Sequence, residues 1–436
     1  MNKTHPTILV LGGGLSGLLA AWHLHYRCCE VEVWEATATI GGWAQTLSWP
    51  GPAGEPGFLE RGPQSLRVAR GSALDRLLGE VDLVERSPGP KGPRWLGMGG
   101  QRHPSPATLE GLLRAPGLSL GGRLRLLAEP FIPSGGSPDE TLHAFFARRL
   151  GGGFAETWLP ALTAGVLAAP PERISVGALP RLRHLETQGG LLLGGLRSRE
   201  RTCLPVGGTG ALARSLATRL GCVTTNRPAQ SLEQLPDGRW RVRTDGMITE
   251  VDAVVLALPT PSAAQLLRPL VPSAADQLAA IPQLDLRVWH SRHPMPNGGA
   301  KGWEQGFGLL IHPPEGRGLL GVVALAADDP RGVPGLLQLR TYLGGAYPVE
   351  AELETWAGVF RELRRWLPEL GEPVQTRFED CPGAFPLLEP GHTERMKHLL
   401  AALPPNLHWL GASRFGPGVP DIAEGIECWA GKLLNR

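Results

Sequence analysis

The sequence predicts a mixed α/β protein in which a parallel sheet opens the chain, a helical insert follows, and a second, mixed sheet comes later. Three observations predict this class. A short apolar run, a glycine-rich turn and a stretch with helical spacing follow one another over residues 7–24. Leu- and Arg-rich helical segments fill residues 104–200, and apolar strands alternate with Gly/Pro turns over residues 289–345. Within the insert, TLEGLLRAPG predicts one helix and Ser137 to Glu140 predicts the start of another, and a last helix is predicted from about Ile422.

Length and composition set the class of protein. A chain of 436 residues exceeds what one hydrophobic core fills, so several domains are expected. The content of 42% apolar and 19% charged residues is that of a globular protein. With 43 basic and 41 acidic residues the charges nearly cancel, which argues against nucleic acid as a partner and leaves a small anionic substrate open.

The cellular setting is predicted from what the sequence lacks. The first residues enter a strand without the zones of a signal peptide, and no apolar run approaches the length of a spanning helix. Six scattered cysteines form no metal-ligand or disulfide pattern. We therefore expect a cytoplasmic protein without a metal site, with peripheral contact at the cytoplasmic face of the inner membrane and a homodimer both left open.

The first β-α-β unit carries a nucleotide-binding fingerprint. Strands are predicted at Thr7 to Leu11 and Glu30 to Glu35, with a helix to about Leu24 between them. The turn that joins strand and helix reads GGGLSG, that is Gly12, Gly13, Gly14, Leu15, Ser16 and Gly17. In a Rossmann-like fold such glycines allow a tight turn, close approach of a pyrophosphate and helix–strand packing, and the acid ending the second strand binds the ribose.

A second glycine turn favours FAD over NAD. Ile40-Gly-Gly-Trp43 follows the acidic residue by a few positions, as is typical of flavin oxidases. The fingerprint alone does not separate the two cofactors. We therefore predict FAD as the cofactor. A Rossmann-type protein that binds NAD is an alternative, ranked after the two alternatives given below.

The chain resembles the protoporphyrinogen oxidases within the flavin amine oxidase superfamily. The resemblance rests on VLGGGLSGLLAAWHL, IGGW, FLERGPQSLR, RWLGMGG, AGVLAAPPERIS, PVGGTGALARSLATRL, QGFGLLI, LRTYLGGAY and GASRFGPGVPDIAEGIECWA, which occur in the family's order over essentially the whole chain. It implies a Rossmann-like FAD-binding domain, a discontinuous mixed-sheet substrate domain and a helical insert. The implied domains are FAD binding at 1–90, 201–282 and 396–436, a substrate strand with a membrane-contacting insert at 91–200, and substrate binding at 283–395.

The resemblance also implies the site residues. Those expected to hold FAD are Gly12, Gly13, Gly14, Leu15, Ser16, Gly17, Glu35, Gly42, Trp43, Gly62, Pro63, Gln64, Ser65, Ala229, Ala412, Pro417, Gly418 and Val419. Those expected to contact the substrate are Arg94, which would pair with a propionate, together with Gly165, Phe307, Leu310 and Leu343. No side chain is expected to act as a catalyst, since the flavin carries the chemistry.

Three positions depart from the family pattern. Gln45 and Ala164 stand where many relatives carry Arg, and Tyr342 occupies a position often filled by Met. These changes put the shape of the pocket in doubt more than the chemistry.

The implied activity is oxidation of protoporphyrinogen IX, with hydride passing to flavin N5 and oxygen restoring the flavin with release of peroxide. The expected partners are therefore a tetrapyrrole and oxygen. Coproporphyrinogen, a polyamine, or a carotenoid or squalene derivative are alternative substrates, and a non-catalytic FAD-binding paralogue is an alternative of another class. The Leu/Arg-rich helices of the insert are expected either to lie on a bilayer or to pack in the core.

Overall fold

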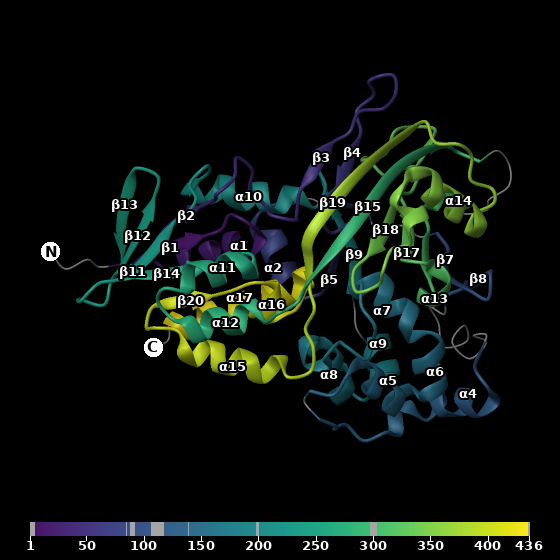
Figure 1. Cartoon of the computed structure of the whole chain (residues 1–436), viewed down its shortest axis with the longest axis horizontal. Helices are drawn as coiled ribbons and strands as arrows, with labels where there is room; N and C mark the ends of the chain where they lie inside the picture. Colours follow the sequence, from purple (N-terminus) through teal and green to yellow (C-terminus); the bar gives the residue numbers. More distant parts are fainter. Residues whose placement is uncertain are drawn as a thin grey trace.

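The computed structural model describes residues 5–83, 85–87, 92–105, 117–137, 139–197, 200–296 and 303–434. A parallel sheet with its covering helices forms one end of the molecule, and a large mixed sheet lies at the other (Figure 1). The long strands β15 (Gln283–Pro294) and β19 (Gln375–Pro386) extend from the mixed sheet toward the parallel one. The helical insert covers one side of the mixed sheet.

The parallel sheet has five strands, drawn from three separate stretches of the chain. Its order is β10 (Val223–Thr224), β2 (Glu30–Trp34), β1 (Thr7–Leu11), β14 (Ala253–Leu256) and β20 (Leu407–Trp409). Leu11 lies opposite both Trp34 and Leu256. Because parallel strands end at the same edge of a sheet, the turns that follow these three residues lie together.

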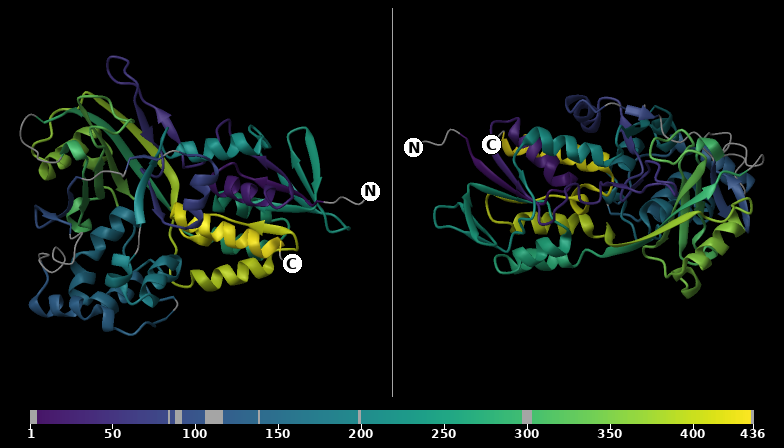
Figure 2. Two further views of the ribbon diagram at one scale, coloured as in Figure 1. Left: turned by 180° about the vertical axis from the view of Figure 1, so that it is seen from behind. Right: turned by 90° about the horizontal axis from the view of Figure 1, so that it is seen from above.

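Helices cover both faces of this sheet, as Figure 2 shows from two further sides. One face packs on α1 (Leu15–His25), α2 (Ala73–Glu80), α10 (Gly210–Leu220) and α17 (Val419–Leu434). The other packs on α11 (Thr260–Leu267), α12 (Pro272–Ala279), α15 (His392–Ala402) and the antiparallel strands β11 (Ser231–Gln234), β12 (Trp240–Thr244) and β13 (Met247–Val251). Both faces are apolar, which explains the nearly continuous hydrophobic run in β1.

The mixed sheet has seven strands. From β19 and β15 it continues through β18 (Leu336–Gly344), β17 (Leu319–Ala324), β16 (Gly308–Ile311), β7 (Arg94–Met98) and β8 (Gln101–Pro104). One face packs on α14 (Trp356–Trp366), with the short helices η3 (Trp303–Gln305), α13 (Pro313–Gly316) and η4 (Ala351–Glu354) nearby. Strands β16 and β7 are parallel, and the other neighbours are antiparallel.

The helical insert consists of short helices. They are α4 (Leu120–Leu127), η1 (Glu129–Phe131), α5 (Leu142–Leu150), α6 (Gly152–Thr157), α7 (Leu159–Leu167), η2 (Val176–Ala178), α8 (Pro180–Thr187) and α9 (Leu191–Arg197). A fully buried ion pair joins Arg149 to Glu129, whose carboxylate also accepts the backbone amides of Leu191 and Leu192. This pair therefore ties α5 and η1 to the start of α9.

Short strands and one short helix complete the described elements. They are the hairpin β3 (Thr46–Ser48) with β4 (Phe58–Glu60), the sheet of β5 (Leu66–Ala69), β9 (Glu200–Pro205) and β6 (Glu85–Ser87), and α16 (Ala412–Phe415). The segment between β4 and β5 connects the end of the molecule that holds the parallel sheet to the mixed sheet.

The fold class predicted from the sequence is confirmed, while two predicted helix starts are displaced. A helix expected to begin around Ser137 to Glu140 begins at Leu142, because the Thr141 hydroxyl accepts the Ala144 amide and caps it there. The last helix begins at Val419 rather than near Ile422.

Two further expectations meet the structure only in part. The predicted helix TLEGLLRAPG lies almost wholly outside the described residues. Within the part of the chain that the structure covers, no helix has the length and apolarity that crossing a bilayer would need. The domain boundaries given above stay a prediction.

Candidate functional site

One large cavity lies where the parallel sheet, the mixed sheet and the helical insert meet. Its volume is about 2210 Å³. The predicted cofactor residues that line it are Gly12, Gly14, Leu15, Ser16, Glu35, Gly42, Trp43, Gly62, Pro63, Gln64, Ser65, Ala229, Ala412, Pro417, Gly418 and Val419. Gly13 and Gly17 belong to the same turn but lie outside the lining.

Glycine stands at the three fingerprint positions Gly12, Gly14 and Gly17 for different structural reasons. Gly12 has φ +109°, and a Cβ there would overlap the carbonyl oxygen of Ala257, which directly follows β14. A Cβ at Gly17 would overlap the carbonyl of Gly12, so this glycine allows α1 to pack against β1. At Gly14, by contrast, a Cβ would meet no atom closer than 3.9 Å and would project into the cavity. Only Gly14 therefore leaves space that the protein itself does not use.

Glu35 holds the glycine turn in shape. One carboxylate oxygen accepts the Gly13 amide at 2.8 Å, and the other accepts the amide and hydroxyl of Thr37 at 2.9 and 2.8 Å. The oxygen that accepts the Gly13 amide can accept one more hydrogen bond, and Glu35 lines the cavity. Its contact with a ribose stays a prediction.

The loop Gly62 to Ser65 is anchored by a buried carboxylate just before it. Glu60 accepts the Thr46 hydroxyl at 2.9 Å, the Thr209 amide at 3.0 Å and one guanidinium nitrogen of Arg331 at 3.0 Å. Arg331 also donates to the carbonyl of Gln64 at 2.7 Å. Elements from both ends of the molecule thus fix this loop along the cavity wall.

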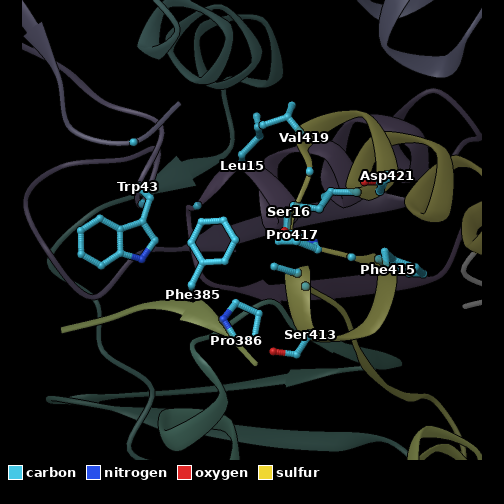
Figure 3. A pocket seen from close by; sticks show the side chains of 18 of the residues that line it. Leu15, Ser16, Trp43, Phe385, Pro386, Ser413, Phe415, Pro417, Val419 and Asp421 are labelled. Atoms are coloured by element: carbon cyan, nitrogen blue, oxygen red, sulfur yellow. The ribbon is translucent and has the colours of Figure 1, made fainter. Parts of the chain in front are cut away.

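The segment before α17 forms the opposite wall. Figure 3 shows Leu15 and Ser16 close to Pro417 and Val419, with Trp43 and Phe385 across the pocket. The first turns of α1 and α17 both reach this pocket, and unpaired amides at a helix start favour negative charge. The arrangement can hold the phosphates of a dinucleotide.

Asp421 lies in the first turn of α17 and lines the cavity. Burial raises its pKa to about 6, although Arg181 acts in the opposite direction. Because the pKa is higher in the folded protein, folding favours the protonated side chain. This contribution to the stability of the folded protein is complete below the pKa of the unfolded chain and is lost as the pH rises through about 6. Above that pH the ionised side chain destabilises the flavin-free protein.

We therefore expect Asp421→Asn to stabilise the flavin-free protein by about 1–2 kcal/mol at about pH 8 and to give no gain at about pH 4. Chemical denaturation of apoprotein at both pH values measures this. Asp276→Asn, which removes an exposed partner of Arg268, is the matched control and should change stability by less than about 0.5 kcal/mol. An equal gain for Asp421→Asn at both pH values would contradict the assignment.

The predicted substrate residues are only partly brought together. Gly165 lines the cavity, and a Cβ there would overlap the side chain of Leu310, so α7 lies directly on β16 at this point. Leu310, Phe307 and Leu343 are not among the lining residues, and the last two are fully buried in the core beneath the mixed sheet. Their substrate contacts stay predictions.

Arg94 lies at the exposed start of β7 and is not among the described residues that line the cavity. It donates to the carbonyls of Gly92 and Pro93, both at 3.2 Å. The predicted propionate contact would require this side chain to turn toward the substrate. It too stays a prediction.

Sequence reasoning missed several lining residues because a motif, where one covers the position, does not show which side chains face a cavity. They include Arg61, Arg227, Arg340, Phe385 and Arg414, together with Ala164 and Tyr342, which the sequence marked only as departures from the family. For Arg340 and Tyr342 a signal was present, since residues two apart on a strand share a face. Gln45, which is not a lining residue, binds the carbonyl of Ile40 at 3.1 Å.

These residues fit FAD. The cavity is long enough to reach from the glycine turn to β19, and Gly14 leaves its wall open. Two buried ring nitrogens on the lining residues Trp409 and His392 (Nε1 and Nδ1) have no hydrogen-bond partner among the described residues, so a ligand can supply one.

Comparison with known proteins identifies the family. Residues 15–422 match the family described as flavin containing amine oxidoreductase. The chain belongs to this family. FAD is therefore its cofactor, and the protein is an FAD-dependent oxidoreductase.

Individual proteins also resemble the chain over most of its length. Human protoporphyrinogen oxidase is 31% identical over 78% of each chain. The coproporphyrinogen III oxidase of Bacillus subtilis (strain 168) is 24% identical over 97% of each. Cyclohexylamine oxidase from Brevibacterium oxydans IH-35A shares the fold, with a TM-score of 0.72, 18% identity and 99% of each chain covered.

Proposed function

We propose that this flavoenzyme oxidises protoporphyrinogen IX to protoporphyrin IX, with oxygen as the electron acceptor. The observation that carries the proposal is a single cavity of about 2210 Å³ that continues past the predicted flavin residues to the mixed sheet. Apolar side chains line that far end, among them Leu286, Val288, Leu320 and Val323. A flat, greasy macrocycle suits such a surface. Similarity to human protoporphyrinogen oxidase supports the same substrate.

The chemistry comes from the cofactor, and the chain positions the reactants. When bound, FAD would supply the oxidising chemistry: a hydride would pass to it from a meso carbon of the substrate, and oxygen would take up the two electrons with two protons, one of them released from a pyrrole nitrogen, as hydrogen peroxide. Three such cycles would yield the porphyrin. The apolar side chains of the mixed sheet exclude water, and the close packing of Gly165 on Leu310 shapes the edge of the substrate space.

Coproporphyrinogen III is the second candidate substrate. Its four carboxylates need more cations than the single arginine that the sequence identified. The cavity wall supplies others, since Arg61, Arg67, Arg70, Arg181 and Arg340 all line it. Similarity to the Bacillus subtilis coproporphyrinogen III oxidase supports this alternative.

Turnover of the two porphyrinogens in air, followed by porphyrin fluorescence, tests the choice. We expect the unmodified protein to have a higher kcat/KM for protoporphyrinogen IX than for coproporphyrinogen III. The variants Arg94→Ala and Arg61→Ala should each have a raised KM for protoporphyrinogen IX. Arg268→Ala, which removes an exposed surface cation, is the control and should change neither constant. A higher kcat/KM for coproporphyrinogen III would replace the proposal by the second candidate. An unchanged KM for Arg94→Ala would refute its propionate contact.

We also propose that the insert touches a lipid surface. Leu120, Leu124 and Phe131 are 74%, 60% and 85% exposed, and Leu127 is exposed beside them. On α4 these leucines follow at spacings of four and three residues, so they share one face of the helix. Leu126 alone on this helix is buried. An apolar face of this kind can enter the headgroup region while the rest of the protein stays in water.

We expect the triple variant Leu120→Ser, Leu124→Ser, Phe131→Ser to partition onto phospholipid vesicles at least about tenfold more weakly than the unmodified protein. Co-sedimentation with vesicles measures this. Ile248→Ser on β13 removes an apolar side chain that is 54% exposed at the far end of the molecule, and it should leave partition unchanged (Figure 1). Equal partition of all three proteins would contradict the lipid contact.

A further inference from the structure

Arg340 is a buried guanidinium on the cavity wall. It projects from β18, is 5% exposed and lines the cavity together with Tyr342, its neighbour on the same face of the strand. The guanidinium carbon lies 4.9 Å from the centre of the Tyr342 ring. The position lies within the segment LRTYLGGAY, but the predicted substrate contacts do not include it.

Its hydrogen bonds are all to the loop that is expected to hold the flavin ring. One terminal nitrogen donates to the carbonyl of Arg61 at 2.6 Å, and the other donates to the carbonyl of Gly62. These two peptide groups immediately precede Pro63, Gln64 and Ser65 on the cavity wall. Arg340 thus fixes this loop to the mixed sheet.

The positive charge of Arg340 has no anionic partner in the protein. Among the described residues, no carboxylate lies within the 4.0 Å of a salt bridge to it. Its Nε is buried and forms no hydrogen bond within the same part of the chain. Buried charges are normally paired. An unpaired cation at a ligand cavity therefore indicates that negative charge arrives with the ligand.

The nearest titratable groups do not neutralise this charge. Glu379 on β19 forms its contacts with His290 and with Arg377, both at 3.4 Å. Burial lowers the pKa of His290 to about 4, and the charge of Arg340 acts in the same direction. His290 is therefore neutral near neutral pH, and the cluster of Arg340, Arg377 and Glu379 keeps a net positive charge.

We propose that Arg340 is a positioning residue that fixes the flavin-facing loop and, through its uncompensated charge, makes the bound flavin easier to reduce. A cation beside the ring stabilises the negative charge that reduction places there, as donors aimed at developing charge do in other active sites. The proposal rests on the assignment of Gly62 to Ser65 to the flavin, and it does not depend on which porphyrinogen is the substrate.

The test is the reduction potential of the bound flavin, measured without substrate by dye equilibration. The variants are Arg340→Gln, Arg340→Met and Arg340→Lys. We expect the first two to shift the oxidised-to-reduced ratio at a given potential by about tenfold toward oxidised flavin, or about 30 mV for this two-electron couple. Arg340→Lys keeps the charge and should stay within about 10 mV of the unmodified protein.

Arg292→Met is the matched control. Arg292 on the neighbouring strand β15 is also buried and also donates to two backbone carbonyls, those of Trp49 at 2.7 Å and Pro50 at 2.9 Å, but it does not line the cavity. It should lower stability without shifting the potential. If Arg340→Met does not fold, the comparison of Arg340→Gln with Arg340→Lys decides.

An Arg340→Gln protein with an unshifted potential, or an equal shift in Arg292→Met, would overturn the proposal. Neither outcome would bear on porphyrinogen turnover, because no substrate is present. Failure of the proposed function would instead appear as an unmodified protein with the expected flavin potential and no porphyrin product. The two failures are therefore distinguishable.

Discussion

Replacing Gly14 by alanine is expected to weaken FAD binding by about ten- to a hundred-fold while the flavin-free protein keeps its stability. The backbone at Gly14 has φ −69° and ψ 172°, which alanine adopts without strain. The new methyl group would meet no protein atom closer than 3.9 Å, so the fold has room for it. It would fill the space through which a pyrophosphate approaches the first turn of α1. Titration of apoprotein with FAD, followed by flavin fluorescence, measures the loss.

Two other glycines separate this effect from a general defect. Gly79→Ala, in the last turn of α2, also adds a methyl group in open space, and it should leave FAD affinity unchanged. Gly12→Ala should instead destabilise the apoprotein itself, because φ +109° and the overlap with the Ala257 carbonyl strain the fold. A Gly14→Ala protein with unchanged FAD affinity would place the cofactor elsewhere.

Removing the carboxylate of Glu60 is expected to cost about 3–5 kcal/mol of unfolding free energy. Glu60 is fully buried. In Glu60→Ala, Asp329 would be the remaining ion-pair partner of Arg331, and Thr209 would lose two hydrogen bonds. Because Arg331 also binds the Gln64 carbonyl, the loop beside the predicted flavin should loosen as well. Chemical denaturation and FAD titration measure the two consequences.

The surface pair at Glu250 provides the control for this substitution. Glu250 contacts Arg239 at 3.1 Å and Arg241 at 2.7 Å on an exposed hairpin. Glu250→Ala should cost less than about 1 kcal/mol, since solvent screens exposed ion pairs. A similar cost for both variants would show that the buried network does not fix the loop.

The nucleotide end of the molecule could be predicted from local sequence. The turn Gly12 to Gly17 is short: its other glycines are explained by close contacts with Ala257, Glu35 or the turn itself, and Gly14 leaves open space. Such chemistry is visible as spacing along the chain. The family resemblance extended the prediction to the Gly62 loop and to the start of α17, which line the same cavity; their contacts with the cofactor stay predictions.

The substrate end could not be predicted in the same way. Phe307 and Leu343 are apolar residues of a sheet, and only the packing of α14 decides that they lie in the core beneath it. Arg340 and Phe385 reach the cavity from strands far apart in the sequence, and neither stretch shows which of its side chains face a ligand. Which face of a mixed sheet meets a ligand depends on tertiary contacts, and residue alternation alone leaves both faces open.

Anaerobic mixing of the FAD-loaded protein with protoporphyrinogen IX tests the central claim most directly. The flavin's visible absorption band should bleach under argon, and admitting air should restore it while porphyrin fluorescence appears. Protein that keeps its oxidised flavin spectrum with both protoporphyrinogen IX and coproporphyrinogen III, although FAD is bound, would contradict the account.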